Sequence, residues 1–130
     1  MQKSSTVALV HKNKVLLLKR GSTAPWNPDK YCLPGGKLEH NETLLDCAVR
    51  ELSEETGIVL SHSELKSVTI NYPKYSKIVF YATSTKEYSV KLNWEHSGYI
   101  WASIKEISCL EIVPGLWTTI QTLRDLEVMM

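Results

Sequence analysis

The sequence predicts an α+β protein in which a β-sheet packs against helices. Three observations lead to this prediction. Several short runs are rich in β-branched and aromatic residues, as strands are. One amphipathic helical pattern lies mid-chain, and a second at the C-terminus is expected to pack on the sheet. With 130 residues, 43% of them hydrophobic, the chain is expected to form a single domain over residues 1–130.

The first elements are expected to form a hairpin. Residues 6–10 and 14–20 are β-rich and flank residues 11–13, which indicates two strands at the start of a sheet. Residues 21–30 contain two prolines, a glycine and several turn formers. We therefore expect a surface loop that carries Trp26.

The central helix follows a Pro-Gly-Gly segment at residues 34–36. These glycines are expected to break regular structure and to adopt backbone conformations closed to other residues. Asn41 or Thr43 can cap the helix, and Gly57 is a natural stop. Its apolar stripe consists of Leu44, Leu45, Ala48, Val49 and Leu52. This spacing predicts an amphipathic helix.

Further strands are expected at residues 64–72, 76–84 and 98–102, from their β-branched and aromatic content. A turn containing Pro73 separates the first two of them. From Pro114 onward, apolar residues recur at steps of four and three, which predicts the C-terminal helix. These residues are Leu116, Ile120 and Leu123.

Charge and cysteine content exclude several classes of function. Fifteen Lys and Arg against fourteen Asp and Glu give a net charge of +1, so no overall field favours a nucleic acid or a membrane. An anionic substrate must therefore be bound by a local site. Cys32, Cys47 and Cys109 form no zinc or redox pair, which indicates reduced thiols. The N-terminal apolar runs are too short for a signal peptide or a membrane span, so a cytoplasmic protein is expected.

Three glutamates of the central helix are the main candidates for chemistry. Glu51, Glu54 and Glu55 are spaced i, i+3 and i+4, so their side chains share one helical face. A solvated acidic surface would produce the same spacing. The diglycine just upstream and the neighbouring Arg50 favour a metal-phosphate site instead, because carboxylate oxygens are the ligands that Mg²⁺ or Mn²⁺ prefers.

The residues around these glutamates resemble the Nudix box, G-x5-E-x7-R-E-U-x-E-E-x-G-U, where U is a bulky aliphatic residue. The fixed positions are matched by Gly36, Glu42, Arg50, Glu51, Leu52, Glu54, Glu55, Gly57 and Ile58. The chain thus resembles the Nudix hydrolase superfamily, including its MutT-like members. This resemblance implies a mixed β-sheet sandwiched between α-helices (α/β/α) and a Mg²⁺-dependent pyrophosphohydrolase, with Mn²⁺ as an alternative cofactor.

The resemblance also assigns roles to individual residues. It implies metal binding by Glu51, Glu54, Glu55 and the backbone carbonyl of Gly35. Glu95 resembles a loop glutamate of the family that binds an additional metal ion or acts as general base. The catalytic base is therefore Glu54, Glu55 or Glu95, and His96 is a weaker rival.

Other residues are expected to bind substrate or support the box. Arg20 resembles a family position that contacts substrate phosphate, and Lys37 is a second candidate; a surface cation is the alternative for each. The resemblance implies an ion pair between Arg50 and Glu42 that braces the loop before the helix. Gly36 and Gly57 complete the structural support of the box.

The expected reaction cleaves a nucleoside diphosphate linked to another moiety into a nucleoside monophosphate plus pyrophosphate or X-phosphate. The expected substrate is a small nucleotide, such as a nucleoside triphosphate or a nucleotide sugar. Leu116 lies where mutator-type triphosphatases place a base-reading asparagine, which argues against that mode of purine recognition. The alternatives are a non-catalytic nucleotide sensor and an RNA 5′-end pyrophosphohydrolase. By resemblance, two copies pair as a homodimer.

Overall fold

The computed structural model describes residues 2–130 and contains a seven-stranded mixed sheet with three α-helices. The strands are β1 (Ser4–His11), β2 (Lys14–Arg20), β3 (Tyr31–Cys32), β4 (Gly35–Lys37), β5 (Lys66–Asn71), β6 (Ser76–Ser84) and β7 (His96–Ala102). The helices are α1 (Leu44–Thr56), α2 (Ile104–Ile107) and α3 (Leu116–Asp125), together with a 3₁₀ turn, η1 (His62–Glu64).

Strand β1 organises the sheet. It runs parallel to β6, with Val7 beside Phe80, and antiparallel to β2 and to the short strand β4. Strand β2 in turn pairs with β3 and β7, while β5 pairs with the outer side of β6. The parallel pair within an otherwise antiparallel arrangement makes the sheet mixed, as the family resemblance implied.

The predicted hairpin is confirmed, with a tighter turn than expected. His11 belongs to β1 and pairs with Lys14, so only Lys12 and Asn13 form the loop. Both residues have positive φ, 49° and 64°. Positive φ at both central positions of a two-residue loop matches the right-handed twist of the flanking strands. The stretch from 21 to 30 is the expected loop, closed at its base by backbone bonds between Arg20 and the loop's end.

Other boundaries shift by about two residues. The strand expected at 64–72 begins at Lys66, because residues 62–64 form a 3₁₀ turn in which Ser61 and Glu64 make a capping box. The strand expected at 98–102 begins earlier, at His96, with a bulge in its pairing to β2. The sequence did not predict β3, β4 or α2, whose two to four residues are too few to show a period.

Helix α1 begins and ends as its sequence predicts. Thr43 is the N-cap: its side chain accepts a hydrogen bond from the Asp46 N–H, and Asp46 accepts one from the Thr43 N–H. Gly57 ends the helix in the left-handed conformation, φ 75°. Cys47 is buried in the helix face, as expected for a small apolar residue.

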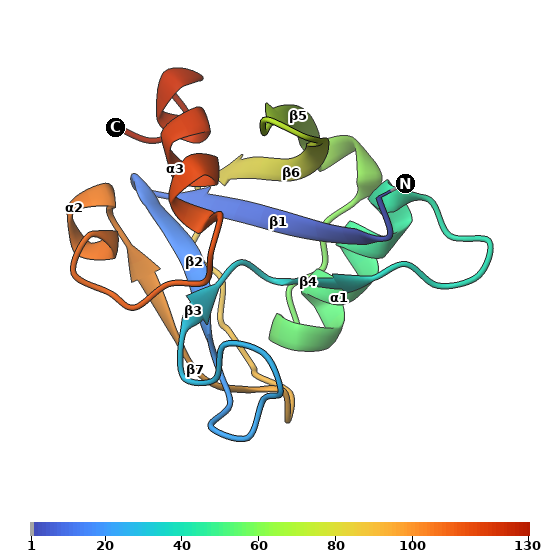
Figure 1. Cartoon of the computed structure of the whole chain (residues 1–130), viewed down its shortest axis with the longest axis horizontal. Coiled ribbons are helices and arrows are strands. Elements are labelled where there is room, and N and C mark those ends of the chain that lie inside the picture. The colour runs from blue at the N-terminus through green and yellow to red at the C-terminus, as the bar shows by residue number, and fades with distance from the viewer. Residues whose placement is uncertain (1) are drawn as a thin grey trace.

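The burial of β1 shows that the sheet is covered by other elements on both faces. Residues 7–10 are all buried although successive side chains point to opposite faces of a strand, so both faces of the sheet must be covered. Figure 1 shows how: α3 crosses in front of β1 and β2, while α1 lies behind β4. The core between these layers includes Leu9, Leu16, Leu17, Leu52, Ile120 and Leu123, all fully buried. Among residues 2–130, none of the helices is long and apolar enough to cross a membrane.

Candidate active site

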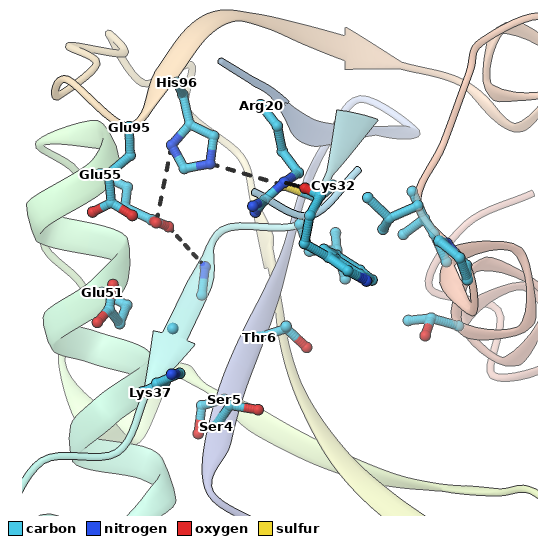
Figure 2. Close-up of a pocket in the computed structure, with 18 of the residues that line it drawn as sticks. Ser4, Ser5, Thr6, Arg20, Cys32, Lys37, Glu51, Glu55, Glu95 and His96 are labelled. Carbon is cyan, nitrogen blue, oxygen red and sulfur yellow. Dashed lines mark hydrogen bonds and ion pairs between the residues drawn. The ribbon is translucent and has the colours of Figure 1, made fainter. Parts of the chain in front are cut away.

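A cavity of about 490 Å³ lies where α1, β4, β1 and the start of α3 meet. The carboxylates of Glu51 and Glu55 form one side of it, and apolar residues near α3, including Val113 and Leu116, form another. Figure 2 shows Glu51 and Glu55 on the helix, pointing toward β4. The cavity therefore joins an acidic edge to an apolar wall, as small-molecule sites often do.

The three glutamates of α1 do not share one environment. Glu55 is 2% exposed, and one of its oxygens accepts a hydrogen bond of 2.8 Å from the Gly35 N–H. Glu51 is 8% exposed and lies against β4. Glu54 lies outside the cavity wall with its side chain half exposed, 3.2 Å from the Arg50 guanidinium. Its assignment as a metal ligand stays a prediction.

Burial perturbs the two inner carboxylates. Desolvation, together with the nearby charges of Glu51, Glu95 and Glu54, raises the pKa of Glu55 to about 8 against the lowering effect of the Gly35 N–H. Desolvation also raises the pKa of Glu51, opposed by the hydrogen bond from Arg50. Crowded carboxylates with few donors favour the binding of a proton or a cation.

The diglycine corrects an expectation about backbone conformation. Gly35 and Gly36 belong to a regular strand, β4, and neither has positive φ. Glycine is required at both positions because neighbouring atoms leave no room for a side chain. A Cβ on Gly36 would overlap the Glu51 carboxylate, and a Cβ on Gly35 would overlap the Ser5 backbone carbonyl. The glycines thus let α1 and β1 approach β4 on its two sides.

Strand pairing also orients the backbone groups of Gly35. Hydrogen-bonded and non-hydrogen-bonded pairs alternate along β1 and β4, and the pairs Val7–Pro34 and Lys3–Leu38 are hydrogen-bonded, from the Val7 N–H to the Pro34 carbonyl and from the Leu38 N–H to the Lys3 carbonyl. Thr6 and Gly35 are therefore a non-hydrogen-bonded pair. The N–H and carbonyl of Gly35 both turn away from β1, so the carbonyl stays available as an oxygen ligand.

Arg50 ties the loop before α1 to the helix. Its Nε and Nη2 donate to the two carboxylate oxygens of Glu42, at 2.7 and 2.9 Å, so the predicted ion pair is present and bidentate. Nη2 also donates to the Lys37 carbonyl, and Nη1 donates to Glu51 at 2.8 Å. The bond from Arg50 lowers the pKa of Glu42 to about 2. One guanidinium thus links the loop, β4 and a cavity carboxylate.

Glu95 and His96 approach the site from the start of β7. Glu95 lines the cavity, exposed, and its side chain accepts a hydrogen bond from Asn93 at 3.3 Å. His96 is buried: Nδ1 lies 3.9 Å from Glu55 and Nε2 lies 3.9 Å from the Cys32 sulfur (Figure 2). Desolvation lowers the pKa of His96, which favours the neutral ring. Sequence reasoning rated His96 only as a rival base and gave no sign of its contact with Glu55.

Cations line the same cavity. Arg20 donates its Nε–H to the Trp26 carbonyl at 2.7 Å and lies 5.3 Å from the Trp26 ring centroid. Arg20, Lys37 and Trp26 all line the cavity, as does Lys77 of β6, which no sequence pattern indicated. A lysine on a strand carries no motif, so only the pairing of β6 with β1 could place it here.

As arranged, no three His, Cys, Asp or Glu side chains within residues 2–130 converge closely enough to hold a metal ion. The inner carboxylates are instead engaged by Arg50 and by the Gly35 N–H. Their chemistry nevertheless fits a hard divalent cation, because the donors at this edge are carboxylate and carbonyl oxygens. The metal assignment stays a prediction.

Comparison with known proteins gives one family. The model of the NUDIX domain matches residues 1–123. The m7GpppN-mRNA hydrolase NUDT17 of Danio rerio is 40% identical over 81 residues, which are 52% of this chain and 27% of that protein. The uncharacterized Nudix hydrolase YvcI of Bacillus subtilis (strain 168) is 29% identical over 123 residues, 88% of this chain and 74% of that one.

Among solved structures, the MutT protein from Methanosarcina mazei Go1 superimposes with a TM-score of 0.70 at 28% identity, covering 95% of this chain and 92% of that one. The matched region spans about a quarter of the zebrafish protein, so that protein's full length is not represented here. The box, the layered mixed sheet and a family model that matches nearly the whole chain agree, and the chain belongs to the Nudix hydrolase family.

Proposed function

We propose that this chain is a Mg²⁺-dependent pyrophosphohydrolase that cleaves the diphosphate of a small nucleoside diphosphate derivative. One observation carries the proposal: the cavity combines the buried carboxylates of Glu51 and Glu55 with the cations Arg20 and Lys37. The products are a nucleoside monophosphate and either pyrophosphate or X-phosphate. A nucleoside triphosphate and a nucleotide sugar both fit this definition.

The metal ligands in this proposal are Glu51, Glu54, Glu55 and the Gly35 carbonyl, with Glu95 at an additional position. Mg²⁺, or Mn²⁺ in its place, would neutralise phosphate oxygens and lower the pKa of the attacking water. The acidic residues would exchange their present partners for the cation. Arg50 would keep the loop and β4 aligned with the helix, because its bonds to Glu42 and to the Lys37 carbonyl do not involve the cavity carboxylates.

Substrate phosphate would be bound by Arg20 and Lys37. The carbonyl and the ring of Trp26 orient the Arg20 guanidinium, which leaves its terminal nitrogens to bind phosphate oxygens. The attacking water needs a proton acceptor at the acidic edge, and Glu54, Glu55 and Glu95 are the candidates. His96, whose lowered pKa favours the neutral ring, lies against Glu55, with its Nδ1 3.9 Å from the carboxylate.

Glu55→Gln tests the proposal most directly. The change keeps the shape of the side chain and removes the group that can ionise to bind a cation in this crowded, buried site. Mg²⁺-dependent turnover on a panel of nucleoside triphosphates, nucleotide sugars and ADP-ribose should fall at least a hundredfold, about 2.7 kcal/mol of barrier. The matched control is Glu87→Gln, an exposed glutamate outside the cavity, which should keep wild-type turnover.

Folding of the variant can be checked separately. Removal of a desolvated carboxylate surrounded by like charges should leave the metal-free protein at least as stable as the wild type in urea unfolding. Loss of turnover with stability retained supports the proposal. Wild-type turnover in the Glu55 variant would refute the role of Glu55, and no Mg²⁺-dependent turnover of any panel member by the wild type would refute the activity.

One observation favours a second candidate. A matched relative is named m7GpppN-mRNA hydrolase, so a capped or triphosphorylated RNA 5′ end is an alternative substrate. The net charge of +1 provides no overall attraction to an RNA chain. A short capped RNA belongs in the same assay: if it exceeds the small nucleotides in kcat/KM, RNA is the substrate. The presence of all the box carboxylates argues against a non-catalytic sensor.

A further inference from the structure

Lys77 is a half-buried cation in the cavity wall that lies outside the Nudix box. Within β6 it pairs with Ile70 of β5, so both side chains point to the same face of the sheet. Tyr72 continues that face, and its ring centroid lies 5.8 Å from the Lys77 Nζ. Thr119 of α3 lines the same cavity, which places this face on the α3 side of the sheet.

Lys37 reaches this cavity from the other side of β1. Ser4 pairs directly with Lys37, and Ser4 and Lys77 together line both the main cavity and a smaller one next to it. Gln2 holds β1 beside β6 at this end, because its side-chain amide bonds to the N–H and the carbonyl of Ile78. Two strand spacings of ~4.8 Å put the backbones of the two lysines about 10 Å apart. Their side chains can therefore meet one group bound over Ser4.

The charge on these lysines is uncompensated. Within residues 2–130, no carboxylate lies within ion-pair distance of Lys37, Lys77 or Arg20. Burial without a counter-ion lowers the pKa of Lys77, and only the Tyr72 ring face offers it partial compensation. A desolvated cation without a counter-ion is unfavourable unless a ligand supplies the opposite charge.

The cavity therefore has an acidic end, which favours a cation, and a basic end, which favours an anion. Its acidic edge, at Glu51 and Glu55, fits the scissile diphosphate with its metal, and this assignment rests on the proposed function. Lys77 lies on β6, and β1 with its Ser4 separates it from β4 and the acidic edge beside β4. We propose that Lys37, Ser4 and Lys77 form a subsite for a further anionic group of the substrate, so that Lys77 selects nucleotides carrying a third phosphate over those ending in an uncharged sugar.

A matched pair of substrates tests this subsite. A nucleoside 5′-triphosphate and the 5′-diphosphate of the same base differ by one phosphate, and ADP-ribose provides an uncharged terminus. In Lys77→Met, kcat/KM for the triphosphate should fall about ten- to a hundredfold, the loss expected for one charged hydrogen bond. For the diphosphate and ADP-ribose it should change less than about threefold. Lys77→Arg keeps the charge and should restore most of the preference.

Lys74→Met is the matched control, because Lys74 is exposed in the turn before β6 and its replacement changes the net charge by the same amount. It should leave all three substrates unaffected. An equal loss on all three substrates in Lys77→Met would show a structural role and overturn the proposal. No loss on any of them would overturn it too.

A binding measurement separates this proposal from the proposed function. Calorimetry with Mg²⁺ and the α,β-methylene analogues of the same triphosphate and diphosphate requires no turnover. Lys77→Met should weaken the triphosphate analogue about tenfold or more and the diphosphate analogue less than threefold. If the wild type binds the triphosphate analogue no better than the diphosphate analogue, the subsite is refuted whatever the outcome of the hydrolysis assay. If binding follows the prediction and no substrate is cleaved, only the proposed activity fails.

Discussion

Gly36→Ala should change the geometry of the site while leaving the stability of the fold nearly unchanged. The new Cβ would overlap the carboxyl group of Glu51, which is the far end of a flexible side chain. Glu51 can therefore yield by changing rotamer, at about 0.5–1.5 kcal/mol. Alanine also reduces the freedom of the unfolded chain relative to glycine, by about 0.4–1 kcal/mol, which offsets that cost. The loss of the Glu51–Arg50 bond is offset by the release of a desolvated carboxylate, so the free energy of unfolding should change by less than about 1 kcal/mol.

The effect on activity should be much larger. Moving Glu51 breaks its 2.8 Å bond from Arg50 and displaces a carboxylate from the acidic edge. Misplacement by about 1 Å near a reacting centre can cost roughly a hundredfold in rate, about 2.7 kcal/mol of barrier. We expect kcat/KM to fall by that factor and the Mg²⁺ concentration for half-maximal activity to rise.

Two other glycines provide controls for the same substitution. In Gly35→Ala the Cβ meets the backbone of Ser5, which cannot turn aside without moving β1, so unfolding should become easier by about 1–3 kcal/mol or more. In Gly98→Ala the nearest atom is 3.9 Å away, so neither stability nor activity should change appreciably.

Urea unfolding and Mg²⁺-dependent hydrolysis, measured on the three variants in parallel, check this reasoning. Activity within twofold of the wild type in Gly36→Ala would show that the position of the Glu51 carboxylate does not matter. A loss of stability in Gly36→Ala equal to that in Gly35→Ala would show that the obstruction is not confined to a side chain. Either result refutes the argument.

Two further predictions concern the helix cap and the thiols. Asp46, whose pKa is lowered by its bond from the Thr43 N–H and by His62, stabilises the fold above the ordinary carboxyl pKa of 3.8, and this contribution disappears as pH falls through the lower folded value. Asp46→Ala should therefore destabilise the fold at pH 7, and the difference from wild type in urea unfolding should shrink as pH falls below 3.8; a difference as large at pH 3 as at pH 7 would contradict the capping argument. Of the three thiols, exposed Cys109 should react rapidly with Ellman's reagent, whereas Cys32, whose pKa burial raises to about 12, and buried Cys47 should react only on unfolding. If all three thiols reacted rapidly in the folded protein, Cys32 and Cys47 would not be buried as the structure has them.

Much of the fold could be predicted because its signals are local. The strands at 14–20 and 76–84 have the bounds that their composition indicated, and α1 begins at a threonine cap and ends at a glycine. The short elements were missed because they carry no such local signal. Strands β3 and β4 exist only because β2 and β1 supply partners, and two or three residues carry no period of their own.

The same contrast between local signals and tertiary contacts applies to the candidate site. Glycine at 35 and 36 was expected to supply unusual backbone angles, yet it serves close packing, which depends on the side chains that arrive from β1 and α1. The three glutamates look equivalent along the helix, but only contact with β4 buries Glu51 and Glu55 and leaves Glu54 half exposed.

The sequence by itself determined the family resemblance, the order of the main elements, the caps of α1 and the Arg50–Glu42 pair, because each depends on residues near one another in the chain. Only the tertiary structure decided which carboxylates face the cavity, that His96 lies against Glu55, and that Lys77 borders Ser4 opposite Lys37. These contacts join residues tens of positions apart through strand pairing. Register and burial are properties of the assembled sheet, which no local pattern encodes.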